Sequence, residues 1–146
     1  MILLKALIVI ITFLFMEFVA WFAHKYIMHG FLWFLHKDHH QVDKNKKFQK
    51  NDYFFLIFAI PSIICLVVGA ESYNYLFFIG LGILLYGLAY FMIHEVIIHR
   101  RLPPPSKTKS KYIIAIRKAH KIHHKNRNKE HCINFGMLIV PIKYFK

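Results

Sequence analysis

The sequence predicts an all-α integral membrane protein with three transmembrane helices and a cytoplasmic, histidine-rich helical cap. Hydrophobic residues make up 57% of the 146 residues, a fraction above that of ordinary soluble domains. They are concentrated in three long stretches, and most Lys and Arg residues lie in the segments between and after these stretches. We expect a single membrane-embedded domain over residues 1–146, because the chain has the length of one ordinary domain.

The first expected helix is Ile2–Phe22, which contains Lys5 near its start and Glu17 within it. At about 1.5 Å per residue, a helix of this length covers the roughly 30 Å hydrocarbon core of a bilayer. A basic residue before an apolar stretch also occurs in signal peptides, but no small-residue cleavage site follows here. We therefore expect this helix to be retained as a transmembrane span.

Two further spans are expected at residues 53–69 and 75–93. Pro61 lies inside the second span and is expected to kink it, because proline removes a backbone hydrogen bond. Only residues 70–74 separate the two spans. Such a short connection predicts that they form a tight antiparallel hairpin.

The distribution of basic residues predicts the orientation in the membrane. Residues 25–52 contain six Lys, and the chain after His99 contains 13 Lys and Arg, whereas residues 70–74 contain one acid and no base. By the positive-inside rule, the two basic segments are cytoplasmic. The formal charge of +13 comes from these basic residues next to the bilayer, where they can contact anionic lipid headgroups. Nucleic acid is therefore not an expected partner.

The remaining segments are expected to lie at the membrane surface. Residues 112–124 have apolar residues at helical spacing and basic residues on other faces, which predicts an amphipathic helix after a proline-rich turn at 101–110. Residues 133–146 are interrupted by Pro141 and Lys143. We expect them to form a short, re-entrant or surface-lying segment rather than a fourth span.

Ten of the eleven histidines fall into four clusters, in which a His-x4-His pair and a His-x2-His-His triplet alternate twice. A single cluster of this kind is often no more than an interfacial or hydrogen-bonded set of side chains. Four clusters in a repeated order, all placed on one side of the membrane by the predicted topology, indicate a metal site. The candidate ligands are His24, His29, His36, His39, His40, His94, His99, His120, His123 and His124, and only His131 lies outside the clusters.

Helical geometry predicts that these histidines bind two ions. Residues three or four apart share a helix face, so His36 can act with His39 or His40 on one ion. Adjacent residues point about 100° apart, so His39 and His40 are expected to bind different ions. His24 and His29 lie roughly 140° apart on a regular helix, which predicts an unwound helix end that Gly30 would permit. Two ions with about four or five nitrogens each would use all ten histidines, whereas one zinc ion would leave most of them unused.

Three acidic residues are candidates for supporting roles. Glu17 lies seven positions before His24 and therefore on nearly the same helix face. A carboxylate within a span needs a partner, so Glu17 is expected to accept a hydrogen bond from a ligand imidazole, to bind metal directly, or to pair with a basic side chain. Glu95 and Asp38 are weaker candidates for the same roles, and Asp38 is more simply explained as a solvated residue.

These motifs resemble those of the bacterial β-carotene 3-hydroxylase family, within the superfamily of fatty acid hydroxylases and sterol desaturases. The resemblance runs nearly end to end. The family usually has Asp after the histidine that matches His94, and this chain has Glu95. The segments that carry the resemblance are MEFVAWFAHKYIMHGFLWFLHKDHH, the ND pair and following aromatic residues at 51–55, HEVIIHRR, AHKIHHK and FGML.

The resemblance implies a non-haem di-iron monooxygenase of the bacterial inner membrane. It implies two iron ions, O₂ as co-substrate, and a carotenoid substrate dissolved in the bilayer. The expected reaction is hydroxylation at carbon 3 of β-ionone rings, from β-carotene to β-cryptoxanthin and then zeaxanthin. Since the chain has no room for a redox domain, electrons would come from a separate ferredoxin-type protein. Plausible docking charges for this acidic donor are Arg100, Arg101, Lys118, Lys121 and Lys125.

Three other functions are compatible with the histidine pattern. The first is a di-iron hydroxylase or desaturase of another membrane lipid, such as a fatty acyl chain or a sterol. The second is a metal transporter, which the predicted topology disfavours because transporters place ligands near the middle of the bilayer. The third is a zinc site that supports hydrolysis.

Overall fold

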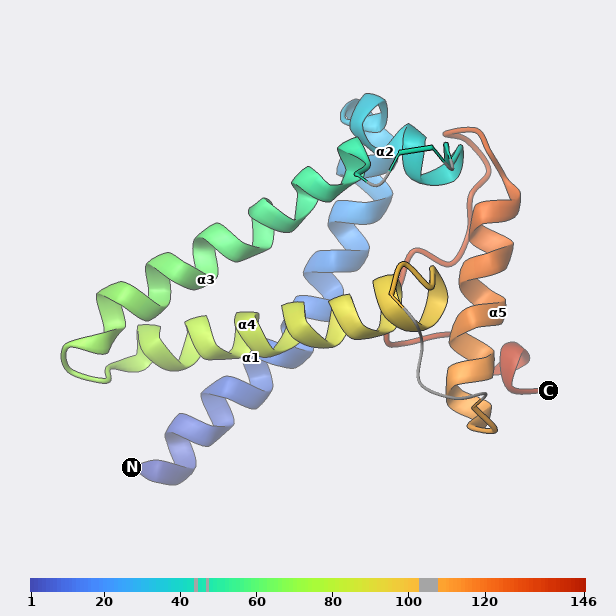
Figure 1. Cartoon of the computed structure of the whole chain (residues 1–146). Coiled ribbons are helices and arrows are strands. Elements are labelled where there is room, and N and C mark those ends of the chain that lie inside the picture. Colours follow the sequence, from blue (N-terminus) through green and yellow to red (C-terminus); the bar gives the residue numbers. More distant parts are fainter. Residues whose placement is uncertain (44, 47, 103–107) are drawn as a thin grey trace.

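The computed structural model describes residues 1–43, 45–46, 48–102 and 108–146, and all regular secondary structure in these residues is helical. Figure 1 shows three long helices, with the shorter elements gathered at the end of the molecule away from the N-terminus. The α-helices are α1 (Ile2–Phe22), α2 (Trp33–His40), α3 (Phe54–Ala70), α4 (Tyr75–Phe91) and α5 (Lys111–Lys125). The other helical segments are η1 (Ala23–Phe31), η2 (Lys50–Tyr53), η3 (Met92–Ile98) and η4 (Ile142–Phe145).

Three helical stretches are long and apolar enough to cross a membrane: Ile2–Phe31, Lys50–Ala70 and Tyr75–Ile98. Their α-helical parts agree with the predicted spans to within two residues at each end, and α3 contains Pro61. The predicted hairpin is confirmed, since α3 packs against α4 after a short turn (Figure 1). Helix α4 also packs against α1, and many large apolar side chains of all three helices are exposed, as expected of lipid-facing surfaces.

Glycines allow α4 to approach both of its neighbours closely. A Cβ atom added at Gly82 would lie 2.6 Å from the Cβ atom of Thr12 on α1, and one added at Gly80 would lie 2.8 Å from the backbone nitrogen of Leu66 on α3. At this level the Ser62 hydroxyl donates a 2.9 Å hydrogen bond to the Gly80 carbonyl. Small residues at crossing points are a common way to pack helices within a membrane.

The cap consists of α2, η2, α5 and the C-terminal segment, at the end of the spans to which α1 and α4 lead (Figure 1). The amphipathic helix predicted at 112–124 is confirmed as α5, which begins after Ser110, whose hydroxyl accepts a hydrogen bond from the backbone N–H of Ile113. The predicted proline-rich turn includes residues 103–107, which lie outside the described residues.

The C-terminal segment forms no helix long enough to span a membrane. It is irregular until η4, and η4 packs against α5. Tyr144 is buried with Ala115 and Ala119 of α5, and Met137 is only 2% exposed. This segment therefore belongs to the cap, and its backbone contributes to the histidine site described next.

Candidate metal centre

The ten predicted histidines lie together in two adjacent groups. Five histidines in one group and four in the other offer ring nitrogens that lie within 4.8 Å of one another. His94 is assigned to the second group because its Nε2 atom lies 3.2 Å from that of His39. All ten are buried except His99 and His124, which are half-buried, and His131 is exposed. Cluster A comprises His24, His29, His36, His40 and His123, and cluster B comprises His39, His94, His99, His120 and His124.

Three histidines of the two His-x4-His pairs lie on π-helices, and the fourth, His99, directly follows one. The segments η1 and η3 continue α1 and α4 in π-helical form, in which hydrogen bonds join residues five apart. The backbone N–H of His99 accordingly donates to the carbonyl of His94 over 2.9 Å. The expected unwinding of the helix end is therefore present, in the form of a π-helix, which has more residues per turn than an α-helix. Gly30 has non-helical dihedral angles (φ −96°, ψ −124°), and the π-helical register brings residues five apart close to one face.

The two His-x2-His-His triplets divide their adjacent histidines between the clusters, as the 100° rotation per residue predicts. On α2, His40 lies in cluster A and His39 in cluster B. On α5, His123 lies in cluster A and His124 in cluster B. Each half of the repeated pattern thus supplies four histidines to one cluster and one to the other. The two exchanged residues, His39 and His123, occupy the same position of the two triplets.

In cluster A, every histidine has its Nδ1 atom bonded to an oxygen that can only accept. Carbonyl oxygens cannot donate, so each Nδ1 carries the ring proton and each Nε2 presents a lone pair to the centre of the cluster. The acceptors are the backbone carbonyls of Phe135, Lys129, Asn126 and Ile133, for His24, His29, His40 and His123 respectively, and the side-chain oxygen of Asn51 for His36, at 2.6–3.1 Å.

In cluster B, side chains rather than backbone carbonyls orient two of the five histidines. His39 Nδ1 lies 3.0 Å from Gln49 Oε1, and His94 Nδ1 lies 2.6 Å from Glu95 Oε1. The predicted contact between Glu95 and an imidazole is therefore present. The longer side chain, where the family usually has Asp, still reaches the ring nitrogen.

An ion-pair network holds Glu95 and the segment around η2 in place. Arg101 donates to Glu95 over 2.9 Å and to both oxygens of Asp52 over 2.7 and 2.8 Å. Arg101 is one of the expected docking charges, and its guanidinium also supports the histidine site. Sequence reasoning did not assign roles to Gln49, Asn51 or Asp52, although the ND pair at 51–52 was part of the resemblance.

The inward-facing nitrogen atoms leave space that a cation would fill. Nε2 atoms face each other at 3.2 Å in three pairs and at 2.9 Å in a fourth. Where both Nδ1 atoms carry protons, two lone pairs face each other in such a pair, which is unfavourable unless a positive charge lies between them. The buried Nε2 atoms of His40 and His124 have no hydrogen-bond partner among the described residues. This donor set fits a metal centre with two ions.

Burial keeps the cap histidines neutral, as metal ligands must be. Loss of solvation lowers the pKa of His36 to about 2 and the pKa values of His99 and His123 to about 3, and neighbouring histidines contribute in the same direction. Neutral imidazoles are available to bind a cation at pH 7 without prior loss of a proton. The same cause lowers the pKa values of His39, His40, His120 and His124.

The sequence-based expectation for Glu17 was wrong. Its carboxylate contacts neither an imidazole nor a basic side chain among the described residues. It accepts hydrogen bonds from the Tyr86 hydroxyl and from the backbone N–H groups of Met137, Leu138 and Ile139. The expected hydrogen bond to a ligand imidazole was inferred from the helix face alone. The position of the C-terminal segment, which fills this face, could not be predicted from the sequence.

Asp38 has a structural role in the cap. Its carboxylate accepts hydrogen bonds from the backbone N–H groups of Lys50 and Asn51, at 2.5 and 3.3 Å. These contacts tie α2 to η2 and so help to hold Asn51 against His36. The contact of Asp38 with the histidine site is therefore indirect.

The model of the fatty acid hydroxylase family matches residues 9–143. The chain belongs to the fatty acid hydroxylase family. It is 41% identical over 137 residues to a β-carotene hydroxylase from Pantoea ananas, covering 94% of this chain and 78% of the relative. A β-carotene hydroxylase from Pseudescherichia vulneris is 38% identical over 136 residues, covering 93% of this chain and 77% of the relative. No solved structure matches the chain.

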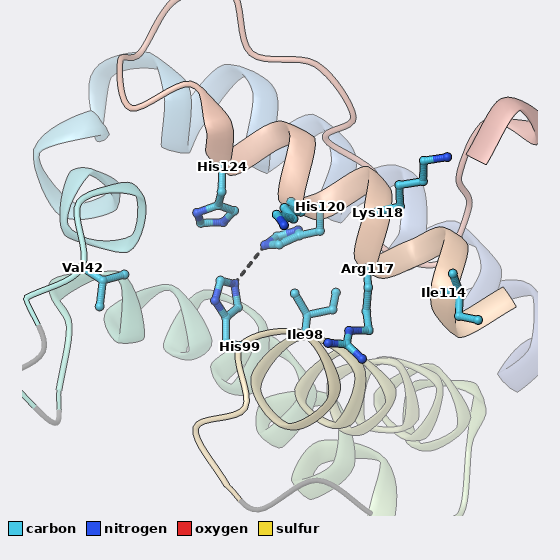
Figure 2. Close-up of a pocket in the computed structure, with 9 residues that line it drawn as sticks. Val42, Ile98, His99, Ile114, Arg117, Lys118, His120 and His124 are labelled. Atoms are coloured by element: carbon cyan, nitrogen blue, oxygen red, sulfur yellow. Dashed lines mark hydrogen bonds between the residues drawn. The ribbon is translucent and has the colours of Figure 1, made fainter. Parts of the chain in front are cut away.

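In this member of the fatty acid hydroxylase family, a cavity opens onto cluster B. Figure 2 shows His99, His120 and His124 close together on one side of it, with Arg117 and Lys118 on α5 nearby. The cavity of about 570 Å³ has both apolar and basic walls. The residues that line it are Val42, Ile98, His99, Ile114, Arg117, Lys118, His120, Lys121 and His124.

Proposed function

We propose that the protein is a membrane carotenoid hydroxylase that inserts oxygen from O₂ at carbon 3 of β-ionone rings. It would convert β-carotene to β-cryptoxanthin and then to zeaxanthin. The observation that carries this proposal is the pair of five-histidine clusters with inward-facing Nε2 atoms at the ends of apolar spans. The similarity to proteins named β-carotene hydroxylases supports the choice of substrate.

The proposed cofactor is a pair of iron ions, one held by each histidine cluster. Neutral imidazole is a suitable ligand for iron, and bound iron would supply the activation of O₂ that C–H hydroxylation requires. Nδ1 contacts fix the orientation of cluster A completely and that of His39 and His94 in cluster B. Such contacts hold the Nε2 atoms in place before a metal binds.

Aromatic residues form apolar walls around the clusters. The rings of Trp33 and Phe135 lie 5.0 and 5.1 Å from His29, and the ring of Tyr90 lies 5.0 Å from His94. These walls would exclude water and favour a hydrocarbon substrate near the metal ions. Because the two His-x4-His pairs follow directly on α1 and α4, a substrate dissolved in the bilayer would reach the clusters from the ends of the spans.

The proposed location is the bacterial inner membrane, with the histidine centre on the cytoplasmic side. The positive-inside distribution of Lys and Arg supports this orientation. A ferredoxin-type donor would supply electrons at the basic surface of the cap. Lys118 and Lys121 line the cavity next to cluster B and are the best-placed docking charges, while Arg100 and Lys125 are exposed further candidates.

Expression in a bacterium that accumulates β-carotene tests the proposed reaction. The wild-type chain is expected to produce β-cryptoxanthin and zeaxanthin, and the His120→Ala variant, expressed at the same level, is expected to leave β-carotene unchanged. Metal analysis of the purified wild-type protein is expected to give about two irons per chain. Unchanged β-carotene despite folded, iron-loaded protein would instead favour another lipid substrate. Stoichiometric zinc without iron-dependent turnover would contradict the oxygenase proposal.

A further inference from the structure

We propose that Glu17, in the first membrane span, is a positioning residue for cluster A. It would act by fixing the C-terminal strap, defined as residues 126–139, against the transmembrane helices. This inference rests on the metal centre proposed above, and it adds a residue outside the histidine motifs to the machinery that holds one of the two ions.

The strap supplies most of the oxygens that orient cluster A. Four of its backbone carbonyls accept hydrogen bonds from the Nδ1 atoms of four of the five histidines in this cluster. Asn126 caps the end of α5, but the rest of the strap contains no regular secondary structure, so neither a helix nor a sheet fixes the other three carbonyls. Its position must therefore come from contacts with other segments.

Glu17 provides a strong contact of this kind. Its Oε1 atom accepts from the three consecutive N–H groups of Met137, Leu138 and Ile139 at 2.9–3.1 Å, and its Oε2 atom accepts a 2.8 Å bond from the Tyr86 hydroxyl on α4. Glu17 is 7% exposed. Consecutive backbone N–H groups form a concave site for an anion, so one carboxylate fastens the strap to two spans.

The chain around these contacts leaves little room for movement. A Cβ atom added at Gly136 would lie 2.8 Å from the Ile139 carbonyl oxygen and 3.3 Å from Glu17 Oε1. Phe135, whose carbonyl orients His24, is only two residues before Met137. Without the carboxylate, three N–H groups next to a membrane span would lose their acceptor, and the strap would move to satisfy them.

The effect of Glu17 is expected to be selective. The Nδ1 atoms of His39 and His94 in cluster B are oriented by Gln49 and Glu95, which belong to other segments. Movement of the strap would therefore disturb cluster A and leave the known supports of cluster B in place. A purely structural role of Glu17 in folding would instead weaken both clusters together.

Cobalt(II) titration of the purified, metal-free full chain in detergent tests the inference, with visible absorption and metal content as readouts. The wild type is expected to bind two ions. Glu17→Met, which removes both acceptors at similar length, is expected to weaken one site by about 10- to 100-fold and leave the other unchanged. Glu17→Gln keeps one oxygen to accept from the backbone N–H groups, and Tyr86→Phe removes only the hydroxyl donor to Glu17. Both variants are therefore expected to lose less metal affinity than Glu17→Met, at the same site.

Double variants identify the weakened site. In a His120→Ala background, where cluster B is disabled, Glu17→Met is expected to weaken the remaining ion. In a His36→Ala background, where cluster A is disabled, it is expected to change nothing. Wild-type affinity at both sites, or equal losses at both, would contradict the inference. If Glu17→Met does not fold, the same criteria apply to Glu17→Gln and Tyr86→Phe. Absence of metal binding by the wild-type chain would instead contradict the proposed metal centre.

Discussion

At the scale of single residues, the two nitrogens of each imidazole have separate tasks. In seven of the ten clustered histidines, Nδ1 is bonded to an oxygen of the surrounding protein. Nε2 faces the interior of a cluster, so ring orientation is set by the protein and not by the ion. Histidine spacing could predict which rings converge, but not their acceptors, because four of these are backbone carbonyls that have no residue-type signature.

We expect each clustered histidine to be required for hydroxylation. Replacing any one of the ten with Ala removes one metal-facing nitrogen and is expected to abolish or nearly abolish product formation in the β-carotene-accumulating host. His131→Ala is the matched control, since His131 is exposed and lies outside both clusters, and it is expected to retain activity. Near wild-type activity in several cluster variants would mean that the ten histidines do not form one centre.

The metal-free protein is expected to lose stability as the pH falls below about 6.5. Burial lowers the pKa of His99 and of His123 from 6.5 to about 3. Between these values the unfolded chain binds more protons than the folded chain, so the free energy of unfolding rises with pH in this range. Urea unfolding of the metal-free protein at pH 5.0 and at pH 7.5, with the same amount of detergent at both, checks this prediction. The free energy of unfolding of the His120→Ala variant is expected to depend less steeply on pH. Equal or greater stability of the wild-type protein at pH 5.0 than at pH 7.5 would contradict the prediction.

At the scale of elements, the helices followed from the sequence and the π-helices did not. The spans and α5 were predictable because long apolar stretches and an amphipathic pattern identify helices without reference to the rest of the fold. The His-x4-His spacing is not compatible with one face of an α-helix, and we explained it by unwinding. The unwinding is present as η1 and η3, whose hydrogen bonds join residues five apart, and this π-helical form is what the sequence did not specify.

The contact between α1 and α4 sets the distance between the two histidine pairs that follow these helices. Gly82→Ala is expected to destabilise the protein by about 1–3 kcal/mol, because the added methyl group would overlap Thr12. Gly87→Ala on the same helix is the matched control. Nothing lies within 4 Å of its added Cβ atom, so it is expected to be neutral or slightly stabilising. Thermal unfolding followed by circular dichroism in detergent measures both, and equal behaviour of the two variants would contradict the packing argument.

At the scale of the whole molecule, charge and cavity coincide over cluster B. Basic side chains of α5 line the cavity that His99, His120 and His124 reach (Figure 2). The overall excess of positive charge was evident from the sequence. Its position next to one cluster was not, because it depends on how α5 packs against η3.

The double charge reversal Lys118→Glu/Lys121→Glu is expected to raise the KM for an acidic ferredoxin about tenfold at low salt and to flatten its salt dependence. The kcat with saturating donor is expected to change little, since neither lysine belongs to the clusters. Lys37→Glu, at an exposed lysine of α2 that does not line the cavity, is the control. An unchanged KM in the double variant would place the donor elsewhere on the protein.

The exchange of His39 and His123 between the two halves has a consequence for biosynthesis. Neither half of the repeated pattern contains all five histidines of one cluster, since each cluster takes one imidazole from the other half. The complete ligand set proposed for either ion would exist only after the histidines of α5 have met those of α2. A nascent chain could therefore not load either proposed ion fully before α5 has been made and has folded against the first half, so metal uptake would report assembly of the two halves.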